Sequence, residues 1–294
     1  MKHSSLCRGL VAALSLLAIT NFGHAASTAS LTLGGLMDSE DGRGYDADAF
    51  FAPNDHWSFG AGIGHSQSKL TGAEFSGRSL RFNTEVTVSS FSFGVAAQNW
   101  KDSNQLDSDA MQGQLTWTGV SGFSIGALFD DRKLKVQYQA RAPQNQTRPA
   151  TITFDGTGYG ADLAYFGEQW NAGVRYIDYS YGPSLARVQA VIDSPTTTEF
   201  PRVQALVDSI LTRAAGAPDR EISATFGRAL KRTSLQGEWL MQRDALTQTD
   251  INSFSVRFGL RFNPHMELTT TLGMTAGGDS DNATFGGLAL TLRR

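Results

Sequence analysis

Ten charged side chains stand at alternate positions in segments that are otherwise apolar or small. Arg257, for example, stands between Val256 and Phe258. Successive side chains of an extended strand point to opposite faces, so such a segment turns its charge away from its apolar face. Charges that line a water-filled pore would set its charge selectivity, whereas charges that pair across the interior would fill it. The ten residues are Asp46, Asp48, Arg81, Glu85, Asp162, Arg175, Glu238, Arg257, Arg261 and Glu267.

Small residues share the face that carries these charges. We expect Arg261 to lie opposite Glu267 across the short turn between them. Glycine supplies 31 of the 294 residues, and glycines on the charged face favour an open interior, although glycine can equally mark a bend in a strand. The glycines on this face are Gly60, Gly62, Gly94, Gly126, Gly160, Gly173, Gly227 and Gly259.

An acidic group falls in two loops, one near each end of the chain. Hard divalent cations prefer carboxylate oxygens, and such a cation could bridge these residues to the phosphates of lipopolysaccharide. The alternative is a solvated polar loop. We favour this alternative over a cation site, because acidic residues are common in solvated loops. The candidate ligands are Asp38, Glu40, Asp41, Asp279 and Asp281.

Patterns for catalysis are weak. His65 and Ser66 are the only candidate base and nucleophile, but adjacent strand residues face opposite sides, and residue 67 is a glutamine. No spacing of His, Cys and Asp suits zinc, and no glycine-rich phosphate loop is present. We therefore expect no enzymatic activity and no cofactor. His56 and His265 fall at turns.

The elements that must hold these side chains are short alternating strands. The segment 57–64 reads Trp-Ser-Phe-Gly-Ala-Gly-Ile-Gly, with four apolar residues on one face and serine and glycine on the other. This period of two predicts strands with one apolar face. We place the strand centres, to within a few residues, at 31–37, 45–52, 57–65, 79–87, 91–99, 110–117, 123–130, 157–165, 170–179, 221–229, 234–243, 253–262, 266–274 and 283–292.

The connections between these strands alternate in length. Those after even-numbered strands are tight, and those after odd-numbered strands are longer and polar. Short turns on one side and long loops on the other are typical of a transmembrane β-barrel. The fold we predict is all-β, an antiparallel up-and-down barrel of about fourteen strands, with twelve or sixteen as alternatives. A soluble β-sandwich also alternates, but its faces would not end in aromatic residues.

Two of the long loops have a pattern of their own. Residues 131–156 keep alternating, which predicts a hairpin that projects outward, with 134–139 paired to 151–154. Residues 184–220 contain a repeated segment, 187–194 and 202–209. Helical spacing there predicts a helix at about 201–215 and a weaker one at about 185–193. This insertion could be a self-packed loop, a lid over the pore or a binding face for an unknown protein.

Residues 1–25 have the three parts of a secretory signal. Lys2 and Arg8 precede an apolar run at 9–20, and small residues lead to an expected cleavage after Ala25. The mature barrel would then span 26–294. Cys7 leaves with the signal, so the mature chain has no cysteine. Loss of the two cations takes the formal charge from −3 to −5, and the chain shows no basic patch for nucleic acid.

The signal and the strand pattern resemble Gram-negative outer-membrane β-barrels, among which monomeric fourteen-stranded barrels such as outer-membrane protein G and the cyclodextrin porin are nearest in kind. The resemblance implies an outer-membrane channel for passive diffusion of small hydrophilic solutes, and 184–220 could gate it. It also implies contact with outer-membrane lipid and lipopolysaccharide, and with the barrel assembly machinery during biogenesis. The alternative is a closed structural or surface-interaction barrel. A lipid-hydrolysing enzyme would need a catalytic cluster that the sequence does not show.

Overall fold

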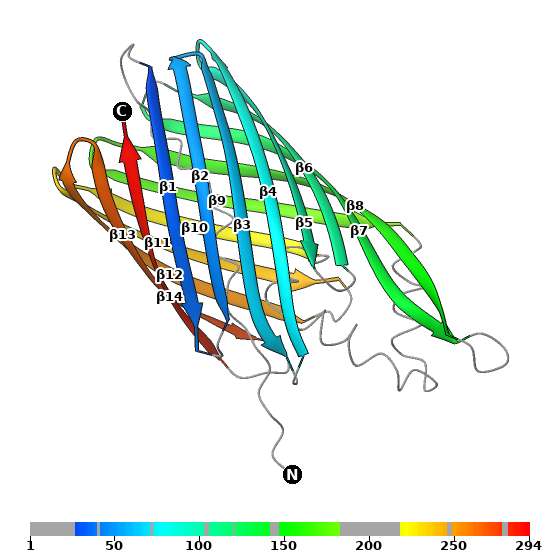
Figure 1. Cartoon of the computed structure of the whole chain (residues 1–294). Coiled ribbons are helices and arrows are strands. Elements are labelled where there is room, and N and C mark those ends of the chain that lie inside the picture. The colour runs from blue at the N-terminus through cyan, green and yellow to red at the C-terminus, as the bar shows by residue number, and fades with distance from the viewer. Residues whose placement is uncertain are drawn as a thin grey trace.

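Fourteen antiparallel strands close into one barrel in a computed structural model of the chain (Figure 1). The structure describes residues 27–39, 42–70, 73–102, 106–119, 121–141, 147–182, 218–245, 249–277 and 282–294. The predicted fold class and strand number are confirmed. No helix in these ranges could cross a membrane.

The strands run in chain order around the barrel, and each pairs with its neighbours in sequence. Their bounds are β1 Thr28–Asp38, β2 Arg43–Asn54, β3 Trp57–Leu70, β4 Ala73–Val88, β5 Phe91–Asp102, β6 Leu106–Thr118, β7 Phe123–Arg141, β8 Thr147–Phe166, β9 Trp170–Tyr181, β10 Pro218–Ala229, β11 Thr233–Asp244, β12 Asp250–Asn263, β13 Met266–Gly277 and β14 Ala283–Arg293.

The outer face of the barrel is apolar. Large side chains such as Ile63 and Leu272 are 60% and 64% exposed, an arrangement that costs free energy in water and is favourable in lipid. Aromatic rings flank this band. Phe123 packs on Tyr165 with ring centroids 4.9 Å apart, near the short turns, and Phe129 lies further along the same strand. The alternation read from the sequence therefore separates a lipid-type exterior from a polar interior.

All six predicted tight turns lie at one end of the barrel, and two of them share a motif. In the turn after β2, the Asn54 Oδ1 atom accepts a hydrogen bond from the His56 backbone N–H at 2.9 Å. The His56 ring Nδ1 lies 3.0 Å from the Thr87 carbonyl oxygen on β4. Asn263 and His265 repeat this geometry after β12, at 2.8 Å and with the ring 3.1 Å from a carbonyl of β14. Each histidine thus ties a turn to the strand beyond it.

At the opposite end, β7 and β8 extend well past the other strands (green in Figure 1). Their pairing runs without a break from Phe123 opposite Tyr165 to Arg141 opposite Thr147. The expected pairing of 134–139 with 151–154 is present, since Leu134 lies opposite Phe154.

The predicted helices at 185–193 and 201–215 lie outside the described residues, which resume at residue 218. One boundary needs correction, because residues 218–220 belong to β10 and not to the loop assigned to 184–220. Pro218 pairs with Asp244 of β11, and a register shift follows it before Arg220. Pro218 led the sequence analysis to assign these residues to a loop, because proline is rare within strands. Proline is, however, tolerated at the first residue of a strand.

The barrel closes where β1 pairs with β14 (blue and red in Figure 1). Thr32 lies opposite Thr291 in this seam, and their hydroxyl oxygens are 2.9 Å apart. A Cβ atom at Gly287 would lie 2.7 Å from the Gly35 carbonyl oxygen. Since that neighbour is backbone, only glycine fits at position 287 without a shift of the seam.

Candidate functional site

The inner wall of the barrel carries all ten charged residues that the sequence singled out. Each stands at an alternate position to the exposed apolar residues of its strand, as Arg257 does between Val256 and Phe258. Alternation in a closed barrel therefore turns these ten side chains inward. Their role in lining an open pore stays a prediction.

On the β2–β4 wall, an arginine and an aspartate meet across the strand between them. Arg81 Nη2 donates to both carboxylate oxygens of Asp48, at 2.9 and 3.0 Å. Gly62 of β3 lies in register between the two residues. A Cβ atom there would lie 3.0 Å from Arg81 Nε and closer still to the Asp48 carboxylate. Glycine thus lets the ion pair lie flat against the wall.

The same arrangement recurs around the barrel. The Gln114 side chain of β6 donates to Asp162 Oδ1 of β8 at 3.0 Å, and the Asp162 carboxylate lies over Gly126 of β7. Asn171 lies over Gly227 in the same way. Neighbouring polar side chains thus lie in the space above several inner-wall glycines, and the open interior that these glycines favour stays a prediction. Of the eight glycines that the sequence singled out, those at which an added Cβ atom would meet a polar side chain within 3.2 Å are Gly60, Gly62, Gly126, Gly173, Gly227 and Gly259.

Gly160 and Gly94 differ from these six glycines. At Gly160 the space for a Cβ atom is taken by the Tyr176 carbonyl oxygen and by Ile177. At Gly94 the nearest atom to a Cβ would be 3.9 Å away. Gly94 therefore keeps the free space that the sequence suggested for all eight.

The β11–β14 wall holds two further ion-paired groups. Arg257 Nη2 lies 3.0 Å from Glu238 Oε2. Arg261 lies opposite Glu267, as expected, with a separation of 3.8 Å. The closer partner of Glu267 is Arg293 of β14, at 2.8 Å. Sequence reasoning missed Arg293, because the last predicted strand ended at residue 292.

A buried polar cluster on β7 and β9 was also missed. The Arg132 Nε and Nη2 atoms bind the two oxygens of Asp130 at 3.0 and 3.1 Å, and Nη2 also donates to the Tyr179 hydroxyl at 2.9 Å. That hydroxyl donates to Asp130 at 3.2 Å, and Asp130 is only 2% exposed. Leu128 and Ile177 pack beside the ring. The sequence ended this strand at residue 130, so the Asp-x-Arg spacing inside it was not recognised.

Three predicted residues stand apart from these ion pairs. Asp46 and Glu85 form no salt bridge with any residue that the structure describes, although Thr87 donates to Glu85 at 3.4 Å. Arg175 faces Asp162 across the β8–β9 pairing. It also lies close enough to Glu221 of β10 to interact with it electrostatically.

The proposed cation site at the rim is described only at Asp38. Its Oδ1 atom accepts a hydrogen bond from the Gly42 N–H at 2.7 Å, which is the role of a turn-forming side chain. Glu40, Asp41, Asp279 and Asp281 lie outside the described residues. Within the described ranges, no group of three or more His, Cys, Asp or Glu residues could hold a metal ion.

The candidate catalytic residues lie on adjacent positions of β3. Ser66 is buried at 8% exposure on the inner side, and His65 occupies the alternate, outward position. This is the arrangement expected of neighbours in a strand, and it separates a serine from its only candidate base.

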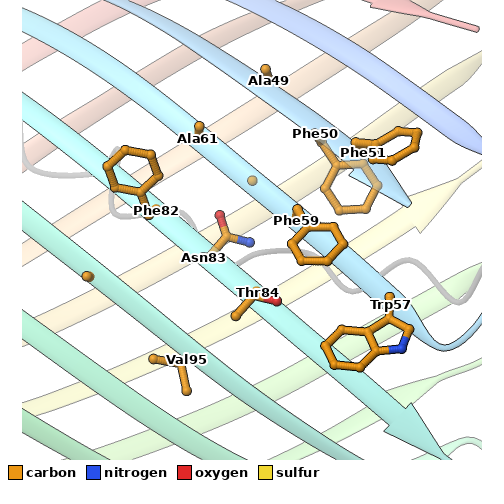
Figure 2. Close-up of a pocket in the computed structure, with 12 residues that line it drawn as sticks. Ala49, Phe50, Phe51, Trp57, Phe59, Ala61, Phe82, Asn83, Thr84 and Val95 are labelled. Atoms are coloured by element: carbon orange, nitrogen blue, oxygen red, sulfur yellow. The ribbon is translucent and has the colours of Figure 1, made fainter. Parts of the chain in front are cut away.

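An apolar depression of about 690 Å³ lies in the wall formed by β2 to β5. Figure 2 shows Phe82 and Phe59 on either side of the small side chain of Ala61, with Trp57 further along the same strand beyond Phe59. Most of the lining side chains belong to the outward, apolar face, and the rings of Trp57 and Phe59 are stacked with centroids 6.1 Å apart. This surface suits a hydrocarbon chain, so contacts for a polar solute must come from the inner wall.

No protein-family model matches the chain, and no curated protein matches it. Solved structures do resemble it. The monoaromatic hydrocarbon channel CymD has a TM-score of 0.53 at 10% identity, with 90% of this chain and 88% of that chain covered. The toluene transporter TbuX of Ralstonia pickettii scores 0.49 at 9% identity, with 92% and 90% covered. The KdgM porin scores 0.43 at 8% identity, with 90% and 98% covered.

These structures are outer-membrane β-barrels, and at such low identities the likeness shows the fold alone. The chain therefore has the fold of an outer-membrane β-barrel.

Proposed function

We propose that the protein is an outer-membrane channel for the passive diffusion of small hydrophilic solutes. The observation that carries this proposal is the contrast between the two faces of a closed wall, apolar outside and charged inside. Charged groups at a lipid surface are costly, whereas a wet interior solvates them. A closed barrel with a charged interior therefore supports a water-filled passage.

The number of strands and the orientation of the inward side chains support an open passage. The interior of an eight-stranded barrel is just wide enough for its side chains, whereas sixteen or more strands enclose a channel. Fourteen strands therefore leave space for a solute only if the inward side chains lie flat against the wall. Asp48 and Arg81 do so, since they meet across Gly62 along the wall. Asp162 does the same over Gly126.

The chemistry of the inner wall favours hydrophilic solutes. CymD is a monoaromatic hydrocarbon channel, but the inner wall of this chain carries charges, so we do not propose an apolar solute. An apolar solute would have to displace water from paired charges such as Arg257 and Glu238 without replacing their hydration. A small polar solute can exchange hydrogen bonds with the same groups.

Single-channel recording tests the proposal. The chain from residue 26 onward, refolded and inserted into a planar lipid bilayer, should give steady current steps whose size rises with salt concentration. Folding is checked separately by the change in gel mobility on heating, which folded barrels show. A folded barrel that gives no current steps would contradict a channel.

We also propose that residues 184–217 gate the channel. The segment joins β9 to β10, and its two ends are held together at the barrel wall, because the Tyr181 hydroxyl donates to the Pro218 carbonyl oxygen at 2.8 Å. Deletion of 184–216 should give larger or noisier steps. Deletion of 142–146, at the tip of the β7–β8 hairpin, is the matched control. Steps that are the same in the deletion and in the full chain would exclude a gate.

A closed barrel that serves structure or surface interaction is the second candidate. The cluster around Asp130 favours it, because Tyr179, Leu128 and Ile177 are also buried on the inner wall. A folded but silent barrel would support this function, and the projecting β7–β8 hairpin would then be the first surface to test for partner binding.

Export to the outer membrane is part of the proposal, with cleavage after Ala25. Amino-terminal sequencing of the protein from outer-membrane fractions should begin at Ala26. Contacts with lipopolysaccharide and with the barrel assembly machinery are proposed on the same basis.

A further inference from the structure

We infer that the interior prefers cations, and that Asp46 and Glu85 on the β2–β4 wall set this preference. The inference rests on the proposed channel function and names the class of solute that the channel favours. The inference depends on the net charge of the inward side chains in each part of the wall, namely strands β2–β4, β7–β10 and β11–β14. It also depends on which of these charges form ion pairs.

The β2–β4 wall has the largest imbalance. It carries the carboxylates Asp46, Asp48 and Glu85 but only one cation, Arg81. Both carboxylate oxygens of Asp48 are bound by that arginine. Asp46 and Glu85 make no salt bridge with any described residue, and both are only partly buried. Two negative charges on this wall therefore lack a neutralising ion pair.

The β7–β10 wall has a smaller imbalance of the same sign. It carries Asp130, Asp162 and Glu221 against Arg132 and Arg175. Arg132 is bound to both oxygens of Asp130. Arg175 lies between Asp162 and Glu221, close enough to interact with each. Arg132 and Arg175 thus each have a nearby carboxylate.

The β11–β14 wall is balanced. Glu238 pairs with Arg257 at 3.0 Å, and Glu267 is shared by two arginines. The third carboxylate of this wall is Asp244, at the outer end of β11. The inner wall thus has a negative excess, which is greatest on β2–β4, and its arginines all lie beside carboxylates.

A negative excess inside a narrow passage raises the local concentration of cations and lowers that of anions. Paired charges contribute little to this field, because the two members of a pair largely cancel each other at a distance. Unpaired carboxylates contribute fully within a Debye length of about 10 Å at 0.1 M salt. Asp46 and Glu85 are the two such carboxylates on the β2–β4 wall, where the negative excess is largest.

The reversal potential across a bilayer with different KCl concentrations on its two sides tests the inference. We expect the K⁺ to Cl⁻ permeability ratio of the mature chain to exceed one. Asp46→Asn with Glu85→Gln should lower that ratio. Each lost charge should reduce it about twofold to threefold, because a unit charge about 7 Å away, screened at about 0.1 M salt, changes the concentrations of the cation and the anion by about 1.6-fold each in opposite directions. Salt above about 1 M should weaken the preference, because screening then acts within about 3 Å.

Asp155→Asn is the matched control, since it removes the same charge from an exposed outward side chain of the β7–β8 hairpin. It should leave the ratio unchanged. If the double variant does not fold, Glu85→Gln alone gives the same comparison with a smaller change.

The outcomes separate the inference from the channel proposal. Clear current steps with a ratio at or below one would overturn cation preference and leave the channel intact. A ratio above one that the double variant does not lower would overturn the assignment to Asp46 and Glu85. A folded barrel without current steps would overturn both.

Discussion

At the scale of single residues, the inner wall depends on pairs of polar side chains more than on any one of them. The Asp130, Arg132 and Tyr179 cluster shows this best, because a nearly buried carboxylate is satisfied by a guanidinium and a phenol together. Burial of a charge is tolerable only when its hydrogen bonds are made. Loss of one partner should therefore cost more than the same loss at a solvated position.

Tyr179→Phe tests this expectation. The change removes the hydroxyl that donates to Asp130 and accepts from Arg132, while the ring and its packing on Leu128 remain. We expect the free energy of unfolding to fall by about 1–3 kcal/mol, measured by urea titration of the barrel in detergent micelles with tryptophan fluorescence.

The matched control is Tyr159→Phe on the outer face of β8, where the side chain is 65% exposed. Its unfolding free energy should stay within about 0.5 kcal/mol of the parent value. An equal loss in both variants would show that the buried cluster has no special contribution.

At the scale of strands and turns, close packing of neighbouring strands decides where glycine is required. Gly287→Ala would place a Cβ atom 2.7 Å from the Gly35 carbonyl oxygen in the β1–β14 seam. Backbone cannot move as easily as a side chain, so we expect a loss of about 1–3 kcal/mol.

Gly94→Ala is the comparison for Gly287→Ala, because both residues face inward and position 94 has no neighbour closer than 3.9 Å. Alanine there should be neutral or stabilise by up to about 1 kcal/mol, through reduced freedom of the unfolded chain. The same urea titration measures both, and equal effects at 287 and 94 would exclude crowding at the seam as the cause.

The strands also show what the sequence could and could not predict. Strand ends at the tight turns were placed closely, as at Phe123 and Trp170, because the apolar period stops there at a turn. The outer end of β7 was placed at 130 and lies at Arg141. At 131–133 the outward residues are themselves polar, as at Asp131 and Lys133, so the contrast between the two faces is lost there. The sequence therefore predicted the continuation as a separate hairpin, with 134–139 paired to 151–154, and not as one strand.

The sequence predicted which residues face inward, but it did not predict most of the contacts between them. Alternation alone turned Arg257 and Glu238 inward, and a short turn indicated that Arg261 faces Glu267. The contacts of Asp48 with Arg81 and of Arg293 with Glu267 depend on register between strands and on glycines beneath the side chains. Neither is visible in a single strand.

At the scale of the whole molecule, closure joins the first strand to the last. A disulfide tests the register of that joint, since the chain from residue 26 onward contains no cysteine. Thr32→Cys with Thr291→Cys should oxidise readily, because the two residues lie directly opposite and their hydroxyl oxygens are 2.9 Å apart. The cross-linked barrel should need a higher temperature to lose its folded gel mobility.

Thr32→Cys with Thr271→Cys is the control for this cross-link. Thr271 lies on β13, with β14 between it and β1, so no disulfide should form within one molecule. Efficient cross-linking of the control pair, or none of the first pair, would contradict the seam.

Closure of the barrel also determines the order in which the strands pair during folding. Thirteen of the fourteen strand pairings join neighbours in the sequence, whereas the seam joins residues such as Thr32 and Thr291 that are 259 positions apart. Joining chain ends across that separation costs about 3 kcal/mol more entropy than joining a twelve-residue hairpin. The hairpins can therefore form early and locally, and the sheet carries two unpaired edges until the end. Those edges can pair with other chains, so the period before β1 meets β14 is when this protein is most exposed to aggregation.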